Sequence, residues 1–265
     1  MYSKIGDKYY EDTLYDQALS VYLDGIGIGS TNPELELNIA KTYIKKGKLN
    51  DARTYLSKPI YSEDTLYESS LLRAYILATT NVDEAKNILR TVEPSDTWKA
   101  FYEEFSSVLD SLTEDTKFNA TKLARVYVNN GYPVLAINLL EPLSEDIVEY
   151  LEGVYFLGRA YLDYGDYDKA IIQFDRALSL GGMEDDILWG KARAYFLKDD
   201  LEGSFDSYSK AISYAGEDVS QELVSEYMDL LLENNQTLRA DELVKKLMNY
   251  ISAPYVRLYG VKVNK

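Results

Sequence analysis

GRAYLDYGDYDKAIIQFDRAL, at residues 158–178, is followed 34 positions later by ARAYFLKDDLEGSFDSYSKAI, at residues 192–212. Both stretches begin with a small residue and Arg-Ala-Tyr, pass through a turn, and continue with a second small residue, an aromatic residue and an Ala. A repeat of this length is typical of proteins that stack short helix pairs. The chain is therefore expected to be all-α, with each repeat forming one antiparallel helix hairpin.

The same skeleton recurs along the chain. Two helices that cross closely need small side chains where their backbones approach, and a helix often ends on Gly or Asn in the left-handed conformation. The small residue of the second helix recurs at Ala18, Ala52, Ala85, Ala136, Ala170, Ser204 and Ala240. That of the first helix is Gly6, Ala40, Ala124, Gly158 and Ala192, each followed three residues later by Tyr9, Tyr43, Tyr127, Tyr161 and Tyr195. The expected turn residues are Gly47, Gly131, Gly165 and Asn235.

The segment YFLGRAYLDYGDYDKAIIQFDRAL (155–178) resembles a tetratricopeptide repeat. The matching positions are Leu157, Gly158, Tyr161, Gly165, Tyr167, Ala170, Phe174 and Ala177. The resemblance extends to seven units, at residues 1–32, 33–66, 66–99, 117–150, 151–184, 185–218 and 221–254. Two units depart from it: either Arg73 or Ala74 takes the close-contact place in the third, and Met228 takes it in the last. The resemblance implies a right-handed superhelical solenoid whose concave surface, built mainly from first helices, holds a peptide or protein segment.

The spacing between the small residues of the third and fourth second helices, Ala85 and Ala136, is longer than one repeat. Residues 95–115 lie between the third and fourth units and place Trp98, Phe105 and Leu109 at helical spacing. This pattern predicts an unpaired helix, either a joint or partner site or, as we prefer, a helix that completes the core. The predicted organisation is 1–99 (three repeats), 100–116 (inserted helix), 117–254 (four repeats) and 255–265 (a cap or tail).

Composition excludes several kinds of chemistry. The chain has no Cys and no His, so disulfides, thiol nucleophiles and His-based triads are absent, and the usual zinc ligands are missing. A formal charge of −16 argues against binding nucleic acid. No apolar run is long enough to insert directly into a membrane. We therefore expect a non-enzymatic, acidic protein with no cofactor and no metal site.

Residues outside the packing pattern of the repeat predict a candidate binding surface. Arg125, Arg159 and Arg193 are spaced 34 apart and each follows a close-contact residue. One helical turn earlier stand Thr121, Tyr155 and Trp189, and Lys122, Phe156 and Phe196 flank the patch. The resemblance implies that these positions face the groove, where Arg can bind carboxylates bidentately and steer an acidic segment inwards. Alternatively, the arginines pair with acids such as Asp163, Asp186 and Glu152 on neighbouring turns.

The chaperone-binding members of the family hold a C-terminal carboxylate with Lys, Asn and Arg. Asn38 matches one such place, but Ser3, Asp7, Tyr67 and Leu71 occupy the others, so this ligand is not expected. The predicted function is a scaffold for an extended or helical protein segment. The alternative is an assembly protein that acts through its convex surface or self-association, with a surface-tethered or secreted lipoprotein as one form.

The repeat phase also bears on localisation. By that phase, the first unit begins just before residue 1, so the chain starts inside a helix. This suggests that an upstream segment such as a leader has been removed, which favours a secreted or surface-tethered protein over a cytoplasmic one. The partner, pathway and oligomeric state do not follow from the sequence.

Overall fold

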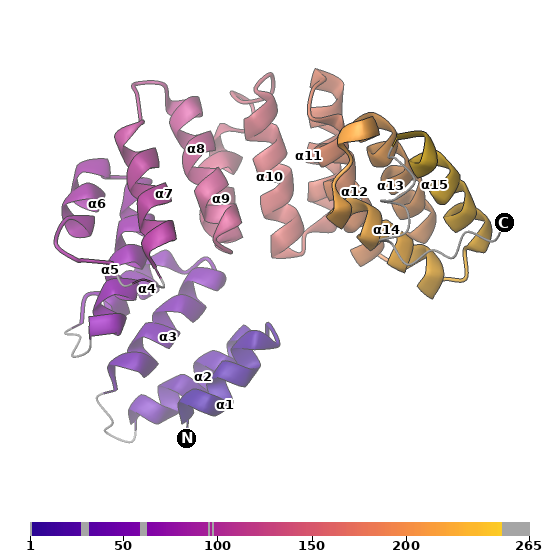
Figure 1. Ribbon diagram of the computed structural model, residues 1–265. Coiled ribbons are helices and arrows are strands. Elements are labelled where there is room, and N and C mark those ends of the chain that lie inside the picture. Colours follow the sequence, from indigo (N-terminus) through magenta and orange to yellow (C-terminus); the bar gives the residue numbers. More distant parts are fainter. Residues whose placement is uncertain (1, 28–31, 59–62, 95, 97, 251–265) are drawn as a thin grey trace. The chain divides into compact units, whose positions relative to one another are not determined.

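The computed structural model describes residues 2–27, 32–58, 63–94, 96 and 98–250, and in these ranges it contains helices and no strand (Figure 1). The predicted all-α helical-repeat fold is confirmed. The α helices are α1 Tyr2–Glu11, α2 Tyr15–Gly27, α3 Pro33–Lys45, α4 Leu49–Leu56, α5 Glu63–Ala78, α6 Val82–Leu89, α7 Lys99–Asp110, α8 Thr116–Asn129, α9 Pro133–Leu140, α10 Leu151–Tyr164, α11 Tyr167–Leu180, α12 Glu184–Leu197, α13 Leu201–Ala215, α14 Gln221–Glu233 and α15 Thr237–Tyr250. Two short 3-10 turns, Glu141–Leu143 and Gly216–Asp218, follow α9 and α13.

Consecutive helices pack as hairpins, α1 on α2, α3 on α4, α5 on α6, α8 on α9, α10 on α11, α12 on α13 and α14 on α15. The small residues that the repeat assigned to the second helices are all buried, with 0–8% of their surface exposed. In the third hairpin Ala74 is fully buried and Arg73 is not, so Ala74 is the close-contact residue. Met228 takes that place in the last hairpin and is buried among Leu223, Leu231 and Val244.

In six of the seven hairpins the turn uses a left-handed residue five positions before the small residue of the second helix; the third hairpin, where Thr80 stands at this place, has no residue of positive φ in its turn. Gly47, Gly131, Gly165 and Asn235 have φ of 71°, 75°, 94° and 57°. Two further residues in the same register, Thr13 and Asp199, also have positive φ, of 60° and 63°. The left-handed region is costly for residues with a Cβ, and most of all for a β-branched one such as Thr. In the first and sixth hairpins the backbone therefore keeps the left-handed turn although the sequence has no Gly there.

Replacing Asp199 by Gly is expected to stabilise the protein by about 0.5–1 kcal/mol, because Gly adopts this φ without a steric cost. Asp199 is exposed, and its neighbour Asp200, which caps α13 by accepting from the backbone N–H of Gly203, is left unchanged. Chemical denaturation of both proteins measures the difference. Glycine at the exposed helical position Asp206 is the control and should lower stability by about 0.5–1 kcal/mol. A loss of stability in Asp199→Gly would contradict the turn assignment.

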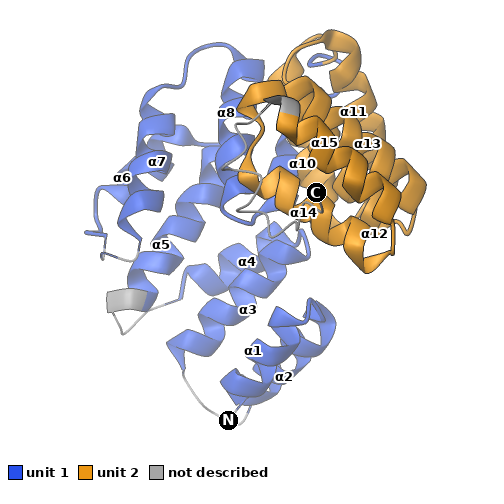
Figure 2. Ribbon diagram, turned by 45° about the vertical axis from the view of Figure 1, so that its right-hand side comes forward, with its two compact units in different colours: residues 1–147 blue, residues 148–265 orange. Residues whose placement is uncertain are grey.

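The helices form two compact units, residues 1–147 and 148–265 (Figure 2). The boundary lies between the fourth and fifth hairpins. The grouping into repeats at 1–99 and 117–254 stays a prediction. The predicted cap or tail at 255–265 lies outside the described residues.

The unpaired helix α7 belongs to unit 1 and packs on α6 and α8. Its residues Phe105, Val108 and Leu109 are buried. The ring of Phe105 meets that of Tyr75 edge-on, with the ring centres 4.4 Å apart. These contacts support the interpretation of this segment as a helix that completes the core.

Unit 1 also contains contacts between helices that lie far apart in sequence. The backbone carbonyl of Gly131 accepts a hydrogen bond from the Lys45 side chain, and the Lys45 ammonium lies 5.3 Å from the centre of the Tyr132 ring. Helix α3 packs on α9 at this place. The hydroxyl of Tyr127 donates to the Tyr75 carbonyl at 2.8 Å, which joins α8 to α5. The second and third hairpins of unit 1 are thus tied directly to the fourth.

Candidate functional site

A pocket of about 850 Å³ lies among the first helices of unit 1, and is called here the N-terminal pocket. Its walls come from α1, α3 and α5, with Tyr22 of α2 and Trp98, which precedes α7. Consecutive first helices thus present one face to the same hollow, as expected for the groove of a helical repeat. The inserted segment contributes through Trp98, so it both fills the core and completes the pocket wall.

The carboxylate of Asp7 is held in place by neutral donors. The hydroxyl of Tyr22 donates to Asp7 Oδ1 at 2.7 Å, and the side-chain amide of Asn38 donates to the same oxygen at 2.9 Å. Ser3 Oγ donates to Oδ2 at 3.1 Å. A Cβ at Gly6 would lie only 2.2 Å from the Tyr22 ring, so the missing side chain at Gly6 is what lets Tyr22 reach Asp7.

Charges in the N-terminal pocket are unbalanced. Its described lining residues carry four carboxylates, those of Asp7, Glu11, Glu34 and Glu68, and one ammonium group, that of Lys41. Lys41 forms an ion pair with Glu68 at 2.7 Å. Burial, together with nearby Tyr15 and Glu68, raises the pKa of the lining residue Tyr10 well above its ordinary value, so this phenol stays neutral.

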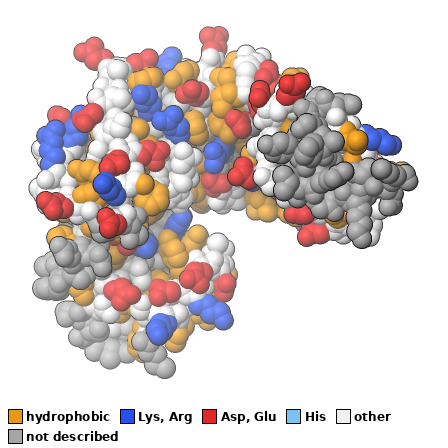
Figure 3. All heavy atoms as spheres, viewed as in Figure 1, with side chains coloured by type: hydrophobic (Ala, Val, Ile, Leu, Met, Phe, Trp, Pro, Cys, Tyr) orange, Lys and Arg blue, Asp and Glu red, His pale blue; other side chains and the backbone are white. Residues whose placement is uncertain are grey.

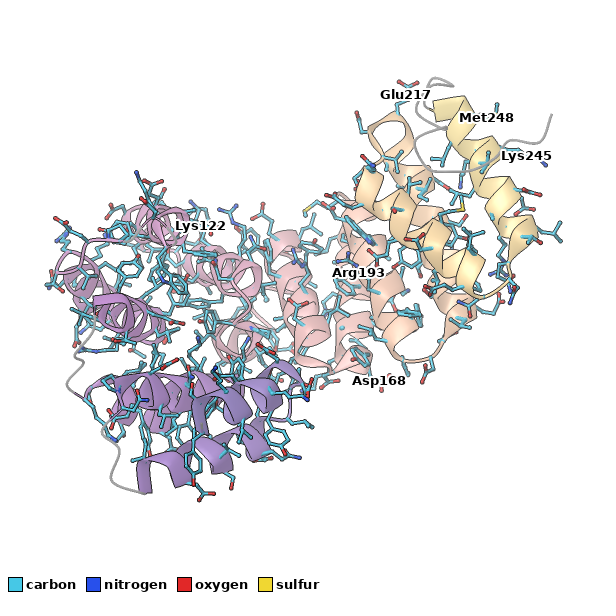
Figure 4. The ribbon with its side chains drawn as sticks, turned by 60° about the horizontal axis from the view of Figure 1, so that its bottom comes forward. Lys122, Asp168, Arg193, Glu217, Lys245 and Met248 are labelled. Carbon is cyan, nitrogen blue, oxygen red and sulfur yellow. The ribbon has the colours of Figure 1, made fainter. Side chains whose placement is uncertain are left out.

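A second polar cluster lies in unit 2 and is called the Glu226 cluster. Trp189 Nε1 donates to Glu226 Oε2 at 3.0 Å. Arg193, which projects from α12 (Figure 4), donates from Nε to Oε1 at 2.8 Å and from Nη2 to Oε2 at 2.6 Å. The Tyr208 hydroxyl donates to Oε1. The guanidinium also lies 4.5 Å from the centre of the Trp189 ring, in a cation–π contact.

The protonation states of this cluster are fixed at neutral pH. Burial raises the pKa of Glu226, but the donors Arg193, Tyr208 and Trp189 outweigh it and hold that pKa below its ordinary value. The hydrogen bond to Glu226 raises the pKa of Arg193 further. Burial and the hydrogen bond to Glu226 raise the pKa of Tyr208 far above 10. Arg193 and Glu226 therefore stay charged at neutral pH and form an ion pair between α12 and α14.

The predicted arginine patch is distributed over both units. Arg125 lies in unit 1 and is exposed; Arg159 and Arg193 lie in unit 2, where Arg159 is half-buried and Arg193 exposed. Arg193 forms an ion pair with an acidic residue, as the alternative interpretation of the arginines expects. The acid is Glu226, however, and not Asp163, Asp186 or Glu152. Burial raises the pKa of Asp186, and the positive charge of Arg159 partly offsets this rise. The patch as one continuous row stays a prediction.

Two of the three residues that stand one helical turn before the arginines are buried, and the binding role of this row stays a prediction. Tyr155 is 8% exposed, and its ring packs on those of Phe156 and Phe174. Thr121 is 1% exposed. Only Trp189 keeps a half-exposed ring.

The flanking positions differ in the same way. Phe156 is buried with Tyr155, whereas Phe196 is 42% exposed. Lys122 (Figure 4) is half-buried; its ammonium donates to Ser111 Oγ at 3.1 Å and lies 4.5 Å from the centre of the Phe118 ring. Lys122 is thus tied to the end of α7.

Among the described residues, no group of three or more His, Cys, Asp or Glu side chains is placed to hold a metal ion. Within the same part of the chain, no helix is long and apolar enough to cross a membrane. On the face shown in Figure 3, acidic side chains lie among the basic ones, and no continuous basic surface forms there.

The chain was compared with known proteins. The family model described as tetratricopeptide repeat matches residues 121–182 and 155–218. Among solved structures, the chain is similar to the C-terminal part of a TPR repeat-containing protein from Cytophaga hutchinsonii, at 18% identity over 98% of this chain and 100% of that chain, with a TM-score of 0.46. It is also similar to MamA AMB-1, at 20% identity over 80% and 95% of the two chains, with a TM-score of 0.34. No curated protein matches the sequence.

Proposed function

We propose that the chain is a non-enzymatic scaffold that binds an extended or helical segment of a partner protein, because residues 121–182 and 155–218 match the tetratricopeptide-repeat family model. Tetratricopeptide repeats generally act as scaffolds for protein–protein interaction. The observation that carries the proposal is the N-terminal pocket, a hollow of about 850 Å³ lined by first helices of successive hairpins. Its combination of aromatic rings and a few oriented polar groups is typical of binding sites.

A photo-crosslinking amino acid at Glu34, which is exposed and lines the pocket, tests this proposal. The same group at Ile172, an exposed residue of the second helix α11, is the matched control. In extracts of the source cells, the Glu34 probe should crosslink a discrete partner through one segment of its sequence. Equal crosslinking from both positions, or modification of small molecules alone, would contradict the proposal.

The predicted arginine patch is a separate part of the proposal, with an acidic segment as its ligand. Once a partner is identified, Arg125→Ala in unit 1 and Arg159→Ala in unit 2 are tested separately, and a residue that contacts the acidic segment should weaken binding about tenfold when replaced, a loss typical of a charged anchor in an interface. Arg193→Ala should instead mainly lower stability, by about 1 kcal/mol, because it leaves the half-exposed Glu226 without its ion-pair partner. Calorimetric titration measures binding, and thermal unfolding measures stability. Unchanged affinity in both variants would remove the arginine patch from the proposal.

Self-association is the second candidate function. It is favoured by large apolar side chains exposed on second helices of unit 2, namely Ile172, Tyr214 and Leu238. Light scattering across a range of protein concentrations tests self-association. A mass that rises with concentration supports assembly, and a constant monomer mass counts against it.

A further inference from the structure

The N-terminal pocket has an excess of negative charge that no described lining residue balances. Lys41 is the one cation in its described lining, and its ion pair with Glu68 uses that charge. Asp7, Glu11 and Glu34 remain. Asp7 accepts from Ser3, Tyr22 and Asn38, and all three donors are neutral, so they orient the carboxylate without cancelling its charge.

The carboxylates share the hollow with aromatic rings. Tyr10 and Tyr22 of the first hairpin and the half-buried Trp98 line it. A cation over the face of a Trp or Tyr ring gains from the ring quadrupole, and more so where water is excluded. Carboxylates and aromatic faces in one hollow are the features that recognise an ammonium or guanidinium group.

The same positions argue against an anionic ligand. Ser3, Asp7 and Asn38 stand where the resemblance places the groups that hold a C-terminal carboxylate in chaperone-binding relatives. Here they form one hydrogen-bonded carboxylate, and a carboxylate ligand would meet a like charge. The pocket therefore favours a positively charged ligand, whereas the corresponding site of the chaperone-binding relatives holds a negatively charged one.

We propose that the N-terminal pocket binds a lysine- or arginine-bearing segment of a partner protein, which rests on the proposed scaffold function. The positive side chain lies between the carboxylates of Asp7, Glu11 and Glu34 and the rings of Tyr10 and Trp98. The chain's formal charge of −16 adds a long-range attraction that speeds the encounter with such a segment. The size of the pocket, about 850 Å³, accommodates several side chains rather than one.

Synthetic peptide libraries test the proposal on the whole protein. Each library has peptides of about 12 residues, randomised around one central residue fixed as Lys, Arg, acetyl-lysine or Glu, an extended length that suits a groove. The immobilised protein should retain the Lys and Arg libraries at least about tenfold more than the other two at low salt. Acetyl-lysine keeps the length of the side chain and removes its charge, so this comparison isolates the charge.

A charge-removing variant locates the binding. Glu11→Gln with Glu34→Gln alters two exposed carboxylates of the pocket and should abolish the preference for Lys over acetyl-lysine. The control, Asp229→Asn with Glu233→Gln, removes the same amount of charge from exposed positions of α14 in unit 2. This variant should keep the preference for Lys over acetyl-lysine. Thermal unfolding confirms that both variants are folded.

Tryptophan fluorescence gives an independent readout. The chain has two tryptophans, so a Trp189→Phe variant reports from Trp98 alone. Retained peptides should change the Trp98 emission. Equal retention of the Lys and acetyl-lysine libraries together with a Trp98 signal would overturn cationic selection and leave the scaffold function standing. No retained library and no Trp98 signal would count against both.

Discussion

Phe174→Ala is expected to lower the free energy of unfolding by about 3–5 kcal/mol, the usual cost of removing a fully buried aromatic side chain. Phe174 is 0% exposed. Its ring lies against two glycines of different helices, Gly158 on α10 and Gly190 on α12. The ring therefore fills the contact within its own hairpin and also the contact with the next one, and neither glycine has a side chain that could close the cavity.

The opposite change at the same place should also be costly. A Cβ at Gly190 would lie 2.6 Å from Phe174 Cζ, so Gly190→Ala forces the ring to move. We expect a net loss of about 1–2 kcal/mol, even though Ala favours helix by about 1 kcal/mol over Gly. Combining Gly190→Ala with Phe174→Leu should restore part of the loss, because the smaller side chain leaves room for the methyl group.

Urea denaturation followed by circular dichroism measures these changes. Ile172→Ala is the control, since this residue lies two positions away on the same helix and is 58% exposed; it should change stability by less than about 0.5 kcal/mol. A loss below about 1 kcal/mol for Phe174→Ala would mean that the two hairpins do not pack through this ring.

Alkaline unfolding above pH 10 is the second large effect. Burial raises the pKa of Tyr67 and of Tyr227 to about 12, and raises that of the fully buried Tyr127 further. A phenol that ionises less readily in the folded chain contributes stability that is complete below the unfolded pKa, near 10. That stability is lost as pH rises through the folded pKa. A two-unit difference corresponds to roughly 3 kcal/mol for each group, so several such tyrosines exceed the stability of a typical domain.

We therefore expect the free energy of unfolding to be level up to about pH 10 and then to fall steeply, with helix loss and tyrosinate absorbance rising together. Tyr127→Phe should shift the alkaline transition to higher pH, at a cost near neutral pH of about 1–2 kcal/mol for the lost hydrogen bond to the Tyr75 carbonyl. Tyr214→Phe, at a 63% exposed position, is the control and should not shift the transition. Tyrosinate absorbance that appears well below the pH of helix loss would contradict this account.

The hairpins could be predicted because their requirements are local and repeated. A small residue at each helix crossing and a left-handed turn residue are visible in the sequence at positions such as Ala170 and Gly165. The positive φ of Thr13 does not follow from its residue type, and Asp199 is of a type that adopts this conformation only in a minority of cases. Their register with Gly47 and Gly165 is the signal that could have revealed them.

The sites could be predicted only in part, because they depend on how helices cross. Arg193 was identified as a charged residue of interest, but its partner Glu226 lies in the last repeat, where the spacing lengthens to 36 and Met228 replaces the usual small residue. In the comparison with a carboxylate clamp, Asn38 matches one position and Asp7 departs from another, and this comparison does not indicate that the two side chains meet. Their joint hydrogen bonding depends on Tyr22 approaching Gly6, which spacing alone does not show.

The bond from Lys45 to the Gly131 carbonyl has a consequence for how this protein can change in length during evolution. In unit 2 the principal contacts join successive hairpins, so duplicating or deleting one 34-residue block leaves the same kind of junction behind. In unit 1 the second hairpin is tied to the fourth across 86 residues, and losing the block between them removes the geometry that closes this tie. We therefore expect the number of repeats to vary more readily in unit 2 than in unit 1, where the pocket lies.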